Sequence, residues 1–258
     1  MLAPSILWAD QHECDLSALP SAEIYLLGER HDNADHHEIQ ACYVGAVAPA
    51  ALVFEMLTAD RAEGVPFEHR LDEDKLRETL DWDNSGWPDF SIYYNIFEAA
   101  PEAKLYGAAV PRETLRSAFQ DGAVGLFGGD ANRFGLDRPL PEDEQAEREE
   151  MQFNAHCEAM PREMMSGMVD AQRLRDAELA RVALQALEET GGPVAVILGN
   201  GHARQDWGVP VYLAAASPET SVFSVGLIEG EPEENSPFDL VISGPVWERE
   251  DPCNAFKS

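Results

Sequence analysis

Three apolar segments of this chain are each followed closely by side chains that can exchange protons or bind metal ions. These side chains are two carboxylates and two imidazoles, namely Glu29, His31, Glu55 and His202. Gathered in one crevice, they would suit acid–base catalysis without a metal. The same set would suit zinc or another divalent cation, because carboxylate oxygens and imidazole nitrogens are common metal ligands. The residue types leave both chemistries open.

The apolar segments that precede these residues have the length and composition of buried β-strands, at 24–27, 51–54 and 194–198. Parallel strands end at one edge of a sheet, and open α/β sheets bind ligands outside those ends. We therefore expect the four side chains to meet there. Arg112 follows a further expected strand at 104–110 and adds a positive charge to the same edge.

The remaining segments alternate between strand and helix. Helices are expected at 36–47, 72–80, 142–160 and 170–190, and further strands at 123–127, 209–213, 222–227 and 239–243. This alternation predicts a single α/β domain over residues 1–258, with a mostly parallel β-sheet flanked by helices on both faces. The segments 58–100 and 141–170 are expected to form a smaller helical insert or cap subdomain.

An aromatic segment lies between the second and third expected strands. It contains Trp82, Trp87, Phe90, Tyr93, Tyr94 and Phe97. Buried packing inside a small helical subdomain is one interpretation. An aromatic-walled ligand mouth is the other, since binding pockets favour aromatic walls.

Composition narrows the function classes. The chain has 48 acidic and 18 basic residues, for a net charge of −30, which disfavours nucleic acid and anionic membranes as partners. No apolar run approaches the roughly 20 residues that span a bilayer. The first residues resemble neither a signal peptide nor a lipidation site, so a cytoplasmic location is expected. The four cysteines form no CxxC pair and are expected to be buried thiols.

Five motifs occur in an order that resembles the ChaN-like haem-binding proteins over residues 20–215. They are residues 27–33 with 36–40, 53–56, 93–100, 172–176, and 199–204 continuing to 208–210. That family looks related to TIKI-type metalloproteases and erythromycin esterases. The resemblance implies a parallel sheet flanked by helices, with a smaller helical domain. It also implies that Glu29, His31, Glu55 and His202 form the pocket shared across the superfamily.

The family resemblance further implies a ligand and a partner. It implies that the chain binds haem or a related tetrapyrrole in iron uptake or handling, with the haem held through tyrosine between two subunits of a homodimer. Tyr93 and Tyr94 are the candidate haem-binding residues, because they lie in the matching aromatic segment. Members are commonly lipoproteins, so the resemblance implies a periplasmic or membrane-associated location as the alternative to the expected cytoplasmic one, although this chain lacks the lipidation signal.

Two functional hypotheses follow. The first is a ChaN-like haem-binding protein. The alternative is a metal-dependent or acid–base hydrolase in the same pocket, where Glu29 is base or ligand and His31 and His202 are ligands or proton shuttles. In that enzyme Arg112 would hold an anionic substrate or an oxyanion. A scaffold without either activity would have these side chains pointing away from one another.

Overall fold

The computed structural model describes residues 5–8, 19–251, 253 and 254. Within these residues, seven strands form one wholly parallel sheet in the order β1-β7-β6-β2-β5-β3-β4. The strands are β1 (Ser5–Trp8), β2 (Ile24–Glu29), β3 (Ala51–Phe54), β4 (Lys104–Gly107), β5 (Val194–Gly199), β6 (Val222–Glu229) and β7 (Leu240–Gly244). The predicted fold class, a mostly parallel sheet flanked by helices, is confirmed.

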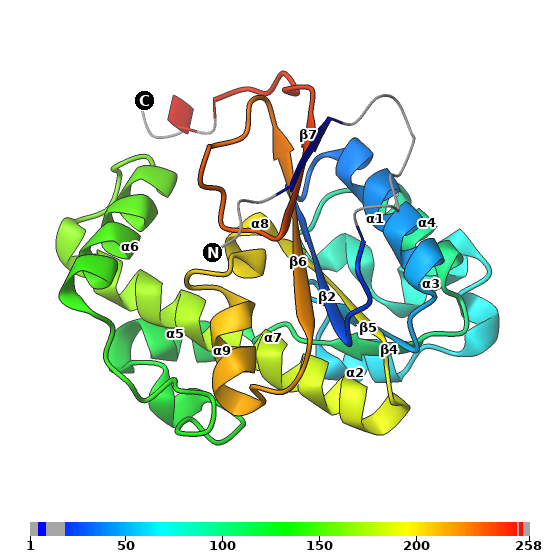
Figure 1. Ribbon diagram of the computed structural model, residues 1–258, viewed down its shortest axis with the longest axis horizontal. Helices are drawn as coiled ribbons and strands as arrows, with labels where there is room; N and C mark the ends of the chain where they lie inside the picture. The colour runs from blue at the N-terminus through cyan, green and yellow to red at the C-terminus, as the bar shows by residue number, and fades with distance from the viewer. Residues whose placement is uncertain (1–4, 9–18, 252, 255–258) are drawn as a thin grey trace.

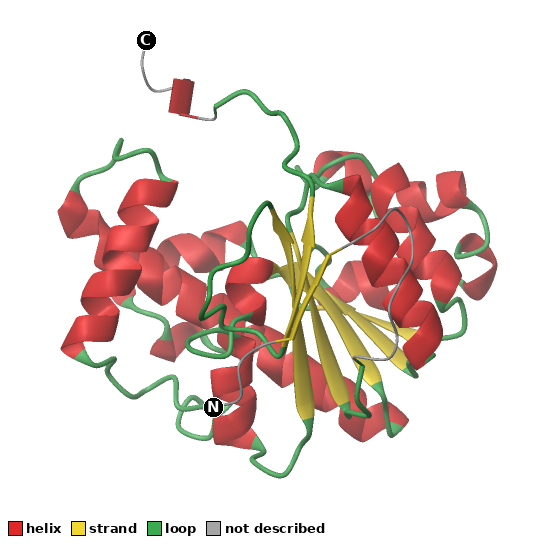
Figure 2. Cartoon of the chain, turned by 45° about the horizontal axis from the view of Figure 1, so that its top comes forward, coloured by secondary structure: helices red, strands yellow, loops and turns green. Residues whose placement is uncertain are grey.

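Helices cover both faces of the sheet (Figure 1). They are α1 (Ala34–Val47), α2 (Ala59–Glu63), α3 (Glu73–Thr79), α4 (Ser91–Ala99), α5 (Arg112–Asp121), α6 (Glu142–Ala155), α7 (Met165–Thr190), α8 (Asn200–Ala203) and α9 (Val209–Ala216). In Figures 1 and 2, α1, α3 and α4 lie on one face, and α5, α6, α7 and α9 lie on the other. The segments 58–100 and 141–170 therefore contribute helices to opposite faces.

Alternating side chains of the central strands supply both cores. Leu26 and Val196 point into the core shared with α7 and α9, whereas Leu27 and Ile197 point into the core shared with α1 and α4. Because both faces of these strands are buried, their sequences are unbroken apolar runs and do not alternate between apolar and polar residues. Each fully buried aliphatic side chain contributes about 1.5–3 kcal/mol.

Two expected strands are wrong. Residues 123–127 contain a short 3-10 helix (Val124–Leu126), and 209–213 begin α9. A short apolar run does not by itself distinguish a buried strand from a buried helix. Pro210 in the first turn of α9 is the missed signal, since proline is favoured where the backbone N–H needs no helical partner.

The sequence suggested buried thiols, but the three cysteines among the described residues are all disulfide-bonded. Cys157 forms a disulfide with Cys253, and Cys42 is disulfide-bonded as well. The first pair is 96 residues apart in sequence, yet its Cα atoms lie 5.3 Å apart. Pairing over such a separation is a product of the fold and cannot be deduced from spacing.

Within the part of the chain that the structure describes, every helix is too short or too polar to cross a lipid bilayer.

Candidate functional site

The carboxyl ends of three adjacent strands bring the predicted side chains together. Strand β5 lies between β2 and β3, and Glu29 of β2 is in register with Gly199 of β5. Glu55 directly follows β3, and its backbone N–H donates to Ile197 O of β5 (3.0 Å). His202 lies in α8, immediately beyond β5. The sheet edge thus gathers Glu29, His31, Glu55 and His202 as the strand pattern predicts.

Glu29 is the acceptor at the β2 end of this edge. Its Oε1 lies 2.7 Å from His31 Nδ1 and accepts a hydrogen bond from the Tyr93 hydroxyl (2.9 Å). Its Oε2 lies 3.2 Å from His37 Nδ1. Burial alone would favour the neutral acid, but the hydrogen bonds and charges of the two histidines lower the pKa of Glu29.

His37 is a buried imidazole that lies against Glu29. Its Nε2 lies 3.0 Å from His31 O, and its Nδ1 lies 3.0 Å from Gln40 Oε1. Gln40 donates its amide to Leu27 O (2.8 Å), so its oxygen faces the imidazole. Because an acceptor faces each ring nitrogen, this arrangement favours the protonated imidazole, which can donate from both nitrogens. Although burial opposes this charge, Glu29 raises the pKa of His37.

Glu55, His202 and Asp176 form the second part of the site. His202 Nε2 lies 3.3 Å from Glu55 Oε1, and its Nδ1 lies 2.6 Å from Asp176 Oδ1. Gly199 donates its backbone N–H to Glu55 Oε2 (2.7 Å). Burial favours neutral groups, yet the two carboxylates raise the pKa of His202 to about 10. His202, His31 and the Gly199 N–H lower the pKa of Glu55 to about 2 against the same burial.

His31 lies between these two parts and faces the solvent. A Cβ atom on Gly199 would lie 2.9 Å from His31 Nε2 and 3.6 Å from Glu55 Oε2, so the missing side chain leaves room for the ring near Glu55. The His31 side chain is 33% exposed, and its ring meets Trp87 edge-on at 4.7 Å. Carboxylates and imidazoles therefore alternate from Asp176 to Glu29. We call Asp176, His202, Glu55, His31 and Glu29 the relay.

The relay is arranged for proton transfer more than for metal binding. Each of its imidazoles is paired with a carboxylate, and only His31 presents a substantially exposed ring. Among the described residues, no group of three or more His, Cys, Asp or Glu is arranged to hold a metal ion. The predicted divalent metal at Glu29, His31, Glu55 and His202 thus gains no support from this geometry.

Three other site residues were predicted. Arg112 and Tyr94 lie outside the relay, whereas Tyr93 is hydrogen-bonded to Glu29 of the relay. Arg112 is exposed at the start of α5, and its Nη2 would lie 3.2 Å from a Cβ on Gly86, in the loop that carries Trp87. Tyr93 is fully buried, with its hydroxyl donating to Glu29. Tyr94 is half-buried on α4 and lies near Phe90, with ring centroids 6.0 Å apart.

Sequence reasoning missed two residues that hold the relay in place. His37 and Asp176 entered the sequence analysis only inside the motif ranges 36–40 and 172–176. Both lie on helices, where their partners are set by packing rather than by a strand tip. The available signal was helical spacing: Gln172 and Asp176 are four residues apart and both contact His202, at 3.1 Å and 2.6 Å from its Nδ1.

The relay predicts a decline in stability at alkaline pH. The pKa of His202 is raised in the folded state, so its contribution is complete below its ordinary value of 6.5 and is lost as pH rises through 10. Denaturant unfolding between pH 7 and pH 10 should show this loss, with a slope of at most roughly 1.4 kcal/mol per pH unit. The His202→Ala variant should lack this component. Parallel curves for both proteins would contradict it.

Comparisons with known proteins agree with this architecture. A family model described as haem-binding uptake, Tiki superfamily, ChaN matches residues 16–213. No curated protein matches the sequence.

Three solved structures match this chain at low sequence identity, and the first of them shares its fold. The structure of cofacial haem binding to ChaN of Campylobacter jejuni has a TM-score of 0.67 and 19% identity, covering 85% of this chain and 86% of that one. The type III effector HopBA1 has a TM-score of 0.43 and 13% identity, covering 86% and 88%. An erythromycin esterase mutant in its open conformation has a TM-score of 0.42 and 12% identity, covering 84% and 74%.

Proposed function

The chain belongs to the family described as haem-binding uptake, Tiki superfamily, ChaN, and on that premise we propose that it binds haem or a related tetrapyrrole. The family match over residues 16–213 carries the proposal. The fold shared with Campylobacter jejuni ChaN, whose structure describes cofacial haem binding, supports it. Iron uptake or handling is the role that such binding would serve.

Accessibility separates the two candidate tyrosines. An axial ligand needs a hydroxyl oxygen that the haem iron can approach. All six tyrosines lie within the described residues, and five of them are buried: Tyr25, Tyr43, Tyr93, Tyr106 and Tyr212. Burial raises the pKa of the Tyr93 phenol, and the Glu29 carboxylate to which its hydroxyl donates raises it further, so tyrosinate formation is opposed. Tyr94 is half-buried, so we assign the axial oxygen to Tyr94.

The surroundings of Tyr94 bear on its chemistry. Partial burial and the carboxylates Glu98, Glu73 and Asp72 raise the pKa of this phenol. A ferric porphyrin carries net positive charge at the iron, which offsets that effect by stabilising the tyrosinate. Ligation at Tyr94 should therefore strengthen as pH rises. A haem held through the half-buried Tyr94 would leave its other face available to a second copy of the chain, as the proposed homodimer requires.

A hemin titration tests this assignment. The wild-type protein should give a shifted Soret band with the charge-transfer absorption of ferric tyrosinate, and Tyr94→Phe should lose both. Tyr93→Phe should keep the spectrum, because its hydroxyl faces Glu29. Light scattering with and without hemin would report the dimer. The spectrum persisting in Tyr94→Phe while vanishing in Tyr93→Phe would reverse the assignment.

A second candidate function rests on the relay. A half-exposed imidazole backed by a carboxylate can accept a proton from water, so we propose acid–base hydrolysis as the alternative activity of the crevice. Arg112, beside the Trp87 loop, would attract an anionic substrate. Assaying p-nitrophenyl esters against pH would test this. The activity should follow a bell-shaped curve and be lost in His31→Ala, and equal rates in both proteins would exclude it.

A further inference from the structure

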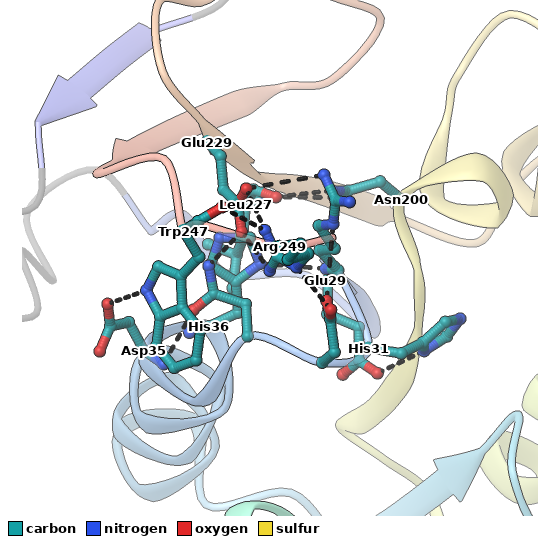
Figure 3. Close-up of polar contacts among 12 residues, drawn as sticks. Glu29, His31, Asp35, His36, Asn200, Leu227, Glu229, Trp247 and Arg249 are labelled. Carbon is teal, nitrogen blue, oxygen red and sulfur yellow. Dashed lines mark hydrogen bonds and ion pairs between the residues drawn. The ribbon is translucent and has the colours of Figure 1, made fainter. Parts of the chain in front are cut away.

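A C-terminal segment runs along the same sheet edge as the relay. Residues 245–251 leave β7 after Gly244 and pass over the start of α1, as the contacts of Trp247 and Arg249 in Figure 3 show. Cys253, two residues further on, is bonded to Cys157. We call residues 245–251, together with this disulfide, the strap.

Arg249 is the main polar anchor of the strap. Its Nη1 and Nη2 donate to the two oxygens of Glu229, at 2.7 and 2.6 Å, and its Nε donates to Asp32 Oδ2 at 2.5 Å. The Glu229 side chain is only 6% exposed and also accepts from Asn33 Nδ2 (2.7 Å). Such two-point, charge-assisted pairing fixes orientation as well as position.

Trp247 adds a second contact to the same region. Its Nε1 donates to Asp35 Oδ2 (2.9 Å) in the first turn of α1. Asp32 directly follows His31, and Asn33 caps α1. Both strap anchors therefore hold the loop that carries the exposed imidazole of the relay (Figure 3).

The disulfide attaches the strap to the opposite flank. Cys157 lies two residues after the end of α6, and α6 is on the other face of the sheet from α1 (Figure 1). Helix α6 also carries Arg148, whose side chain is 3% exposed and whose Nη2 lies 3.9 Å from Asp176 Oδ2. The strap thus connects the His31 loop to the helix that packs against the far end of the relay.

Apolar burial contributes little to holding the strap down. Pro245, Val246, Glu248 and Glu250 are exposed, while Trp247 and Arg249 are half-buried. Segments with few buried apolar contacts open at low free-energy cost. A disulfide restricts such opening chiefly by limiting the conformations of the released chain. The bond to Cys157 is therefore the contact best placed to decide whether the strap stays closed.

We propose that the strap is a redox-controlled gate over the relay. With the disulfide formed, it fixes the distance between the His31 loop and α6 and restricts access to the side chains of the relay. Reduction by a dithiol adds two electrons and two protons to the bond, giving thiols at Cys157 and Cys253 and a disulfide in the reductant. The freed strap then lets α6 and the loop separate.

Histidine acylation measures the gate without using haem. The full-length protein is treated with diethylpyrocarbonate before and after dithiothreitol reduction and thiol alkylation, and acylated peptides are quantified by mass spectrometry. We expect the acylation rate of His202 to rise at least tenfold on reduction, with a smaller rise at His31. His69 lies outside the relay and the strap, with its Nδ1 2.7 Å from Thr79 Oγ1, so its acylation rate should be unchanged.

Variants separate the strap from the other disulfide. Reduction also opens the Cys42 bond, so the Cys157→Ser, Cys253→Ser double variant should reproduce the rise without reductant. Arg249→Ala should raise the His202 rate further, and Arg249→Lys should raise it less. If the double variant fails to fold, the single variant Cys253→Ser, which leaves the Cys42 bond intact, decides. Unchanged His202 rates overturn the gate, as does an equal rise at His69, which would mean global unfolding.

Discussion

Replacing Asp176 with alanine is expected to lower the free energy of unfolding by roughly 3–5 kcal/mol, the cost of removing one partner from a buried, hydrogen-bonded group of charges. Asp176 is 1% exposed and lies 2.6 Å from His202 Nδ1. Its removal leaves Glu55 as the only carboxylate that pairs with His202. The pKa of His202 should then fall from its raised value, and the ring should lose its fixed orientation. Urea unfolding at pH 7 measures the first effect, and histidine NMR titration measures the second.

Asp170→Ala is the matched control for this prediction. It removes a carboxylate from the same helix at a side chain that is 37% exposed and 3.8 Å from Arg173. An exposed ion pair of this kind contributes at most about 1 kcal/mol. The double variant Asp176→Ala, His202→Ala should cost little more than either single change, because the two groups act as one unit. Additive losses would show that Asp176 does not support His202.

The residues at strand tips were predictable because one physical rule places them. Parallel strands end at one edge, and each apolar run before Glu29, Glu55 and His202 had the composition of a buried strand. The rule needs no knowledge of strand order. The predicted position of these residues was therefore unaffected by the wrong assignment of residues 209–213, which form the start of α9.

The rest of the site depends on helices and on the chain end, where no comparable rule applies. Asp176 reaches His202 because α7 packs across the sheet, and that register is set by the whole core. Arg112 follows a strand but starts a helix, so its side chain lies beside Gly86 instead of the relay. The strap joins segments more than 200 residues apart, through Trp247 and Asp35. Such contacts carry no local sequence signal.

Gly28 precedes Glu29 at the end of β2, where α8 and β6 approach the strand closely. A Cβ at this position would lie 2.5 Å from Asn200 Oδ1 and 2.8 Å from Val225 O, because β6 and α8 both approach the end of β2 closely. Asn200 uses this space to bond β6, donating to Leu227 O (2.5 Å) and accepting from Leu227 N (3.2 Å). The absence of a side chain at Gly28 thus leaves room for Asn200. We call its two hydrogen bonds to Leu227 the clamp, because they join α8, which carries His202, to the sheet.

Gly28→Ala should therefore destabilise the fold by about 2–4 kcal/mol, from overpacking against a backbone carbonyl and from the lost Asn200 hydrogen bonds. Gly45→Ala is the control, because a Cβ there meets only Ala99 Cβ at 3.9 Å. In the exposed interior of α1, that change should stabilise the protein by up to about 1 kcal/mol. Opposite signs in urea unfolding are expected for the two variants. A neutral Gly28→Ala would mean that β6 and α8 can separate from β2 at little cost, so the clamp would not fix His202.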